Sequence, residues 1–329
     1  MSIVAILAQI VRIAVPYLFA ASGGVVAERS GVVSLTLEGF MLTGAFAAAL
    51  GSYYGGGPWA GVLAAVIAGL LIGLLHAVSS IRYRADQIVV GIAINLLAVG
   101  ATRFFLRFAF GSSSNSPRVP GFGGAAVSGG GVATASTVAS SAAPSVGGTT
   151  TTAAAAAAGG AAAGYSALAS LANPLIWLGL LAIPVVAFLV YRTSFGLRLR
   201  AAGEKPEAAL SLGVNVGRVR YVAVALSGLL AALGGAYLAL DQHQFTDQMT
   251  AGRGFIALAA VIFGRWDPVR AGVACFLFAA AETVQIQLQG SHALPSQFVE
   301  MIPYVLTIVA LAGVVGRSVP PAALGRVEV

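Results

Sequence analysis

Long apolar runs recur along the chain and set the expected fold. A helix needs about 20 residues to cross a hydrocarbon core of about 30 Å. Runs of this length cover residues 4–22, 32–50, 59–80, 87–108, 172–191, 221–240, 271–289 and 298–316. A further run, 254–264, has only eleven residues, so it is either a short crossing or a re-entrant half-helix. The pattern predicts an all-α, polytopic transmembrane bundle of about nine spans, some of them short or broken.

A stretch of different composition separates two groups of spans. Residues 119–191 contain no charged side chain, and residues 121–164 are mostly Ala, Gly, Ser and Thr. Such a sequence lacks the bulky side chains that build a core. We therefore expect a low-complexity, mostly disordered outer loop over 109–171. N-terminal transmembrane helices at 1–108 would precede it, and C-terminal transmembrane helices at 172–316 and a cytoplasmic tail at 317–329 would follow.

Composition agrees with a membrane protein and excludes most soluble classes. Hydrophobic residues make up 58% of the 329 residues and charged residues 9%, whereas a soluble domain carries roughly 25% charged residues. The net charge of +7 indicates topology rather than a nucleic-acid partner, because Lys and Arg are retained in cytoplasmic loops. The loop 192–220 should be cytoplasmic, since it carries Arg192, Arg198, Arg200, Lys205, Arg218 and Arg220.

The remaining basic positions fix the expected parity of the crossings. They lie at Glu28-Arg29, at Arg82 and Arg84, at Arg265 and Arg270, and at Arg317 and Arg326 in the tail. Two crossings separate neighbouring basic loops only if 254–264 traverses the membrane. This predicts nine crossings, with the N-terminus outside and the C-terminus inside. The outer side then holds three cations that depart from the rule, Arg103, Arg107 and Arg118.

The sequence holds no pattern typical of an enzyme. The single lysine, Lys205, is followed by Pro206, whereas a nucleotide-binding loop requires Gly-Lys-Ser/Thr. His76, His243 and His292 do not stand at metal-ligand spacing, and we expect structural roles for them. The lone Cys275 lies in an apolar run and should behave as a small hydrophobic residue. We expect no catalytic residue, metal site or cofactor in this chain.

Polar residues inside the predicted spans are candidates for function. Glu38 and Asn95 lie within spans, Gln87 opens the span of Asn95, and Glu282, Gln285 and Gln287 cluster on another. Gln87 and Asn95 share one face of their helix to within about 80°. Each polar group is costly in hydrocarbon and should face the bundle interior. Two interpretations remain open, hydrogen bonding between helices and lining of a translocation pathway.

The loop 192–220 contains a short predicted helix at 206–213. Pro206 suits a first helical turn, Glu207 complements the positive helix N-terminus, and Gly213 can end the helix in a left-handed conformation. A helix of about two turns between two spans is either a docking element for another chain or an ordinary linker.

Several motifs together resemble a known family. Glu207-Ala208-Ala209-x-x-x-Gly213 has the spacing of the cytoplasmic loop in permease subunits of ATP-binding-cassette importers. Residues 24–39, 85–96 and 250–268 resemble the branched-chain amino acid/ribose-type permease family, in its nucleoside and simple-sugar branch. The similarity covers about residues 10–110 and 172–316. Ser34 departs from the pattern, because relatives more often have Asn there.

The resemblance implies a multi-pass subunit of a primary importer in the cell membrane. A separate ATP-binding subunit would bind ATP and Mg and act on Glu204, Pro206, Glu207, Ala208, Ala209 and Gly213. An extracytoplasmic binding protein would deliver the solute, and a second, different permease would complete a heterodimer. The solute would be a nucleoside or purine, or otherwise a simple sugar.

Three polar residues of the predicted spans are candidates for the solute pathway. Glu38, Gln87 and Asn95 offer donors and acceptors suited to hydroxyls or a base edge. Alternatives are an ion-coupled secondary transporter, which also requires carboxylates such as Glu38 and Glu282, and an exporter or membrane scaffold.

Overall fold

The computed structural model describes residues 3–112, 114–122, 171–289, 301 and 319–326. This part of the chain is helical and contains no strand. The helices are α1 (Ile3–Arg29), α2 (Leu37–Gly55), α3 (Pro58–Ala77), α4 (Gln87–Phe110), α6 (Pro174–Arg192), α7 (Ser194–Glu204), α8 (Pro206–Ser211), α9 (Val216–Asp241), α10 (Arg253–Phe263) and α11 (Pro268–Gln289). A π-helical turn, Val78–Arg82, continues α3.

Six helices of the described part are long and apolar enough to cross a membrane, namely α1, α3 with its π-helical turn, α4, α6, α9 and α11. The predicted run 298–316 and residues 123–170 of the expected outer loop lie outside the described residues. The all-helical membrane bundle is therefore confirmed, whereas the count of nine crossings stays a prediction.

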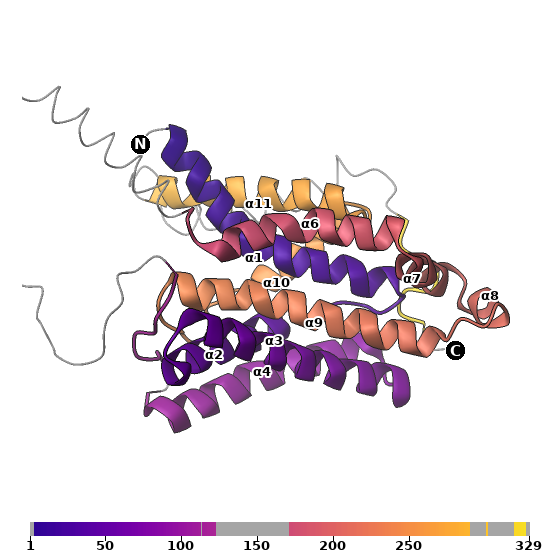
Figure 1. The fold of residues 1–329 in the computed structure, drawn as a ribbon, viewed down its shortest axis with the longest axis horizontal. Helices are drawn as coiled ribbons and strands as arrows, with labels where there is room; N and C mark the ends of the chain where they lie inside the picture. The colour runs from indigo at the N-terminus through magenta and orange to yellow at the C-terminus, as the bar shows by residue number, and fades with distance from the viewer. Residues whose placement is uncertain (1–2, 113, 123–170, 290–300, 302–318, 327–329) are drawn as a thin grey trace, which may run out of the picture.

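The long helices run along one common axis, with the N-terminus at one end and α7, α8 and the C-terminus at the other (Figure 1). Helix α9 is central: 72% of its most apolar stretch is buried, against 22% for α4. Small residues allow this central position. A Cβ on Gly44 of α2 would lie 2.4 Å from Cα of Ala232 on α9, so the two backbones are in contact. Close approach of this kind stabilises helix pairs where lipid gives no hydrophobic driving force.

Helices α2 and α10 begin inside the bundle. The segment before α2, residues 30–36, is irregular yet largely buried, and Leu37 is fully buried. Helix α10 has eleven residues, follows an irregular stretch at 242–252 and packs its first turn on Glu38. Irregular backbone at this depth is tolerated only where protein satisfies its polar groups.

Two expected loop boundaries were wrong, and one helix was not expected. Glu28 and Arg29 belong to α1, and Glu28 is 2% exposed, because Trp266 Nε1 and the Ser34 backbone N–H donate to its carboxylate. The loop 192–220 contains a second helix, α7, which Thr193 caps through the N–H of Gly196. Arg218 and Arg220 lie in α9, which begins at Val216.

The start of the expected outer loop is ordered. The backbone N–H groups of Ser116 and Val119 donate to the carbonyls of Phe245 and His243, each at 2.8 Å. These bonds lie before the Ala, Gly, Ser and Thr stretch, and residues 123–170 of the expected loop are outside the described part of the chain. Cys275 is fully buried, in agreement with its predicted role as a small hydrophobic residue.

Candidate functional site

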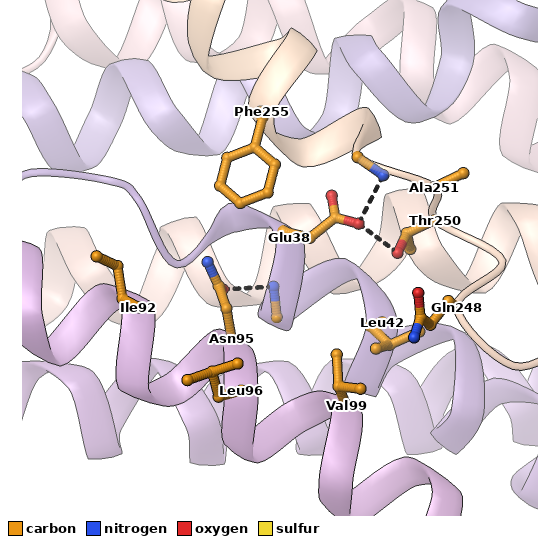
Figure 2. A pocket seen from close by; sticks show the side chains of 12 residues that line it. Glu38, Leu42, Ile92, Asn95, Leu96, Val99, Gln248, Thr250, Ala251 and Phe255 are labelled. Atoms are coloured by element: carbon orange, nitrogen blue, oxygen red, sulfur yellow. Dashed lines mark hydrogen bonds between the residues drawn. The ribbon is translucent and has the colours of Figure 1, made fainter.

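A pocket of about 390 Å³ lies between α2, α4, the turn at 248–252 and α10. Figure 2 shows the side chains around it, with Phe255, Glu38 and Asn95 near one another. Its polar lining consists of Glu38, Asn95, Gln248 and Thr250, and its apolar lining includes Leu42, Ile92, Leu96, Val99 and Phe255. Two of the three residues predicted for a pathway, Glu38 and Asn95, therefore meet in one cavity.

Glu38 stabilises the first turn of α10. Its Oε1 accepts hydrogen bonds from the Thr250 hydroxyl at 2.6 Å and from the Gly252 N–H at 2.9 Å, and its Oε2 accepts from the Gly254 N–H at 2.7 Å. The first N–H groups of a helix have no partner within the helix, and a negative charge there is favourable. Glu38 thus caps α10 from a different helix while lining the pocket.

Asn95 holds the backbone at the start of α2. Its Oδ1 accepts from the Gly39 N–H at 2.8 Å, and its Nδ2 donates to the Leu35 carbonyl at 2.9 Å. A side-chain amide has two N–H donors and two acceptor lone pairs. Among the residues that the structure describes, one donor and one lone pair of Asn95 therefore remain for another partner.

Gln87 has a structural role and does not line the pocket. Its side chain is 3% exposed, and its Oε1 accepts from the Val33 N–H at 2.8 Å. Gln87 and Asn95 share a helix face, as their spacing predicts, and they have the same structural role. Both side chains satisfy backbone groups of the irregular segment before α2, which would otherwise be unpaired in the bundle.

Gln248 and Phe255 are the lining residues that sequence reasoning missed. Gln248 adopts a positive φ of 54°, its side chain is exposed, and its amide has no hydrogen-bond partner within the described residues. Phe255 is 47% exposed on the first turns of α10. Neither residue carries a signal in the sequence, because one lies in a loop and the other in an apolar run.

One member of the polar cluster predicted on α11, Glu282, forms an ion pair. Arg253 Nη2 lies 2.7 Å from Glu282 Oε1, and the Tyr17 hydroxyl also donates to this carboxylate. Arg103, one of the unexpected outer cations, pairs with Asp247 at 2.7 Å. Both carboxylates invoked for an ion-coupled transporter, Glu38 and Glu282, therefore have protein partners.

The predicted coupling helix forms at the end of the bundle that carries α7 and the C-terminus (Figure 1). Helix α8 spans Pro206–Ser211, and Gly213 follows it with a φ of 79°, as predicted. Ala209 is 2% exposed and packs in a cluster with Leu199 and Val216. Exposed residues surround this anchor: Glu204, Glu207, Ala208, Leu210 and Leu212.

Comparison with known proteins assigns the chain to a family. The profile of the branched-chain amino acid transport system permease component matches residues 6–311. The guanosine ABC transporter permease protein NupQ of Bacillus subtilis is 37% identical, over 95% of this chain and 92% of its own. The nucleoside ABC transporter permease protein NupC of Lactococcus lactis is 33% identical, over 97% and 95%.

The ribose import permease protein RbsC of Bacillus subtilis is 41% identical over 26% of each chain. No solved structure matches the chain. The matched residues include five of the six candidate spans of the described part, the sixth from Ile6 onward, and the loop that carries α8. The chain therefore belongs to the branched-chain amino acid transport system permease family and is a multi-pass permease subunit of an ATP-binding-cassette transporter in the plasma membrane.

Proposed function

We propose that this chain is the transmembrane subunit of an ATP-driven importer for nucleosides or purines. The observation that carries the proposal is the pocket beside Glu38, whose lining combines an aromatic ring with side-chain amides. Phe255 can stack on a base, and the free groups of Asn95 and Gln248 can bond to base edges or ribose hydroxyls. The volume of about 390 Å³ lies within the range of small-molecule sites. The relatives named for guanosine and nucleosides cover nearly the whole chain.

A simple sugar is the second candidate solute. The relative named for ribose import supports it over about a quarter of the chain. A free sugar would bind the amides of the pocket without requiring the aromatic ring. Uptake of a labelled nucleoside in the presence of excess unlabelled nucleoside or ribose therefore shows which of the two solutes the transporter binds.

ATP hydrolysis belongs to a partner chain in this proposal. The sequence lacks a nucleotide-binding loop of the Gly-Lys-Ser/Thr type, so ATP and Mg are bound by the ATPase. The coupling residues are Glu204, Pro206, Glu207, Ala208, Ala209 and Gly213. The assignment of these residues is supported by the exposed surface of α8, which the ATPase could contact. The buried Ala209 anchors this surface to the bundle.

The assembly contains further partners. An extracytoplasmic binding protein delivers the solute, and a second, different permease completes a heterodimer in the bilayer. The proposed topology has nine membrane crossings, with the N-terminus outside. The six long helices, the two helices that begin inside the bundle and the run 298–316 together supply them.

Uptake measurements test the proposal. Cells that lack this chain should lose uptake of labelled guanosine or adenosine, and a copy of the gene should restore it. Uptake should also stop when the partner ATPase is removed and should persist when an ionophore collapses ion gradients. Uptake that survives loss of the ATPase but fails with the ionophore would instead support the ion-coupled alternative.

A further inference from the structure

The C-terminal tail returns to the bundle and binds the elements that flank the coupling helix. The Ala323 N–H donates to the Gly203 carbonyl of α7 at 2.9 Å, and the Gly325 N–H donates to the Gly31 carbonyl beyond α1 at 3.1 Å. Pro321 and Ala323 are buried, the latter with 1% of its surface exposed. We call residues 321–326 the strap. It joins α7 to the end of α1.

Arg220 of α9 ties the strap to a third element. Its Nε donates to the Ser30 carbonyl at 3.2 Å, and its Nη1 donates to the Arg326 carbonyl at 3.4 Å. The guanidinium therefore bonds one carbonyl after α1 and one in the strap. A planar guanidinium can bridge two such acceptors, whereas a lysine ammonium is a single point of charge.

The position of Arg220 is energetically unusual. The residue is 4% exposed, no carboxylate lies within ion-pair distance of it in the described part of the chain, and its Nη2 has no hydrogen-bond partner there. A buried charge without a counter-ion is costly. Its hydrogen bonds to the carbonyls of Ser30 and Arg326 offset part of this cost, so the contacts with the segment after α1 and with the strap hold the side chain in place.

The contacts around α7 are too close for independent movement. A Cβ on Gly203 would lie 2.2 Å from the Arg29 carbonyl oxygen. A Cβ on Gly31 would lie 3.0 Å from Arg220 Nη2 and 3.1 Å from the Ala323 carbonyl oxygen. Helix α7, the end of α1, the start of α9 and the strap therefore form one packed body, and α8 projects from it.

We propose that Arg220 is a positioning residue and that the strap makes this body move as a unit when the ATPase displaces α8. The inference rests on the proposed function, because it assumes that α8 receives the motion of the ATPase. With the strap in place, displacement of α8 moves α1 and α9, which border the bundle core. Without it, α7 keeps its direct contact with Arg29 but loses its bonds through the strap to the segment after α1 and to α9, so less of the displacement reaches α9 and more ATP is hydrolysed per solute moved.

The test is the amount of solute moved per ATP hydrolysed, measured on the assembled transporter in proteoliposomes. Arg220→Gln should lower this ratio about fivefold or more, the scale of a typical coupling between sites. Arg220→Lys should lower it as well, since charge alone does not bridge two carbonyls. The matched control is Arg218→Gln, because Arg218 lies two residues earlier on α9 and is exposed; its ratio should equal that of the wild type.

A second pair of variants tests the strap without touching α9. Deletion of residues 321–329 should lower the ratio, whereas deletion of 327–329, which leaves the strap intact, should not. A normal ratio in both Arg220→Gln and the longer deletion would overturn the proposal. The proposal would also be overturned if Arg220→Lys were present in the membrane at normal levels but no longer co-purified with the ATPase. In that case the strap would serve assembly of the transporter. Failure of the wild-type transporter to move any nucleoside or sugar would instead reject the proposed function.

Discussion

The carboxylate of Glu38 on α2 accepts a hydrogen bond from the backbone N–H of Gly254 on α10, at 2.7 Å. Both residues lie in the first turns of helices that begin inside the bundle. The contact joins two segments more than 200 residues apart, |i−j| = 216. Since both helices begin within the bundle, each relies on protein groups for its backbone partners.

Replacing Glu38 tests this cap. Glu38→Ala removes all three accepted hydrogen bonds and should lower the free energy of unfolding by about 1–3 kcal/mol. Glu38→Gln keeps one acceptor and should cost less. Thermal unfolding in detergent measures the effect. Asp86→Asn is the control, because Asp86 caps α4 through Ile88 and Val89 at an exposed position. An equal loss at both sites would argue against a special role for Glu38.

Two glycine substitutions distinguish the effect of close backbone contact from the effect of helix propensity. Gly44→Ala should reduce the amount of folded protein, because its Cβ would meet the Ala232 backbone at 2.4 Å. Gly100→Ala on α4 meets nothing within 4 Å and should stabilise the helix by about 0.5–1 kcal/mol. Midpoints of thermal unfolding compare the two variants. Equal midpoints would contradict the close packing of α2 on α9.

The ring of Phe255 provides a test of the pocket. Phe255→Ala should raise the KM for nucleoside uptake, because base–aromatic stacking contributes about 1–3 kcal/mol. Phe108→Ala is the control, since Phe108 is 81% exposed on α4 and does not line the pocket. An unchanged KM in Phe255→Ala, at normal membrane levels, would remove Phe255 from the solute path.

A charge reversal tests the coupling helix. Glu207→Lys should abolish uptake while the protein stays inserted and abundant, because it reverses the charge on the exposed first turn of α8. Glu207→Gln keeps the shape of the side chain and should retain more activity. Uptake is compared with the amount of ATPase that co-purifies. Normal uptake with normal co-purification in Glu207→Lys would reject the role.

Much of the fold was predictable because hydrophobic length determines which segments cross a bilayer. The runs at 87–108 and 271–289 match α4 and α11 to within a few residues. The boundaries failed where tertiary contacts outweigh composition. Glu28 is an acidic residue, yet it is buried near the end of α1, where Trp266, distant in sequence, donates to its carboxylate. The sequence places Arg220 in a basic loop, because no neighbouring residue indicates that its side chain donates to carbonyls of two distant segments.

The candidate site was predictable only in part. Glu38 and Asn95 stand out because polar residues in hydrocarbon are costly, and the structure places both on one pocket. The same reasoning selected Gln87, which instead holds the backbone of Val33. Single-residue polarity does not distinguish a side chain that bonds its own protein from one that faces a cavity. That distinction depends on how the irregular segments at 30–36 and 242–252 fold.

The burial of Cys275 has a practical consequence. It is the only sulfhydryl in the sequence, and it lies fully enclosed in α11. A polar maleimide added to intact membranes therefore has no native target in this chain. Any thiol engineered onto α8, the strap or the ends of the spans would be labelled alone, so the natural protein already serves as the background for mapping which side of the membrane each segment faces.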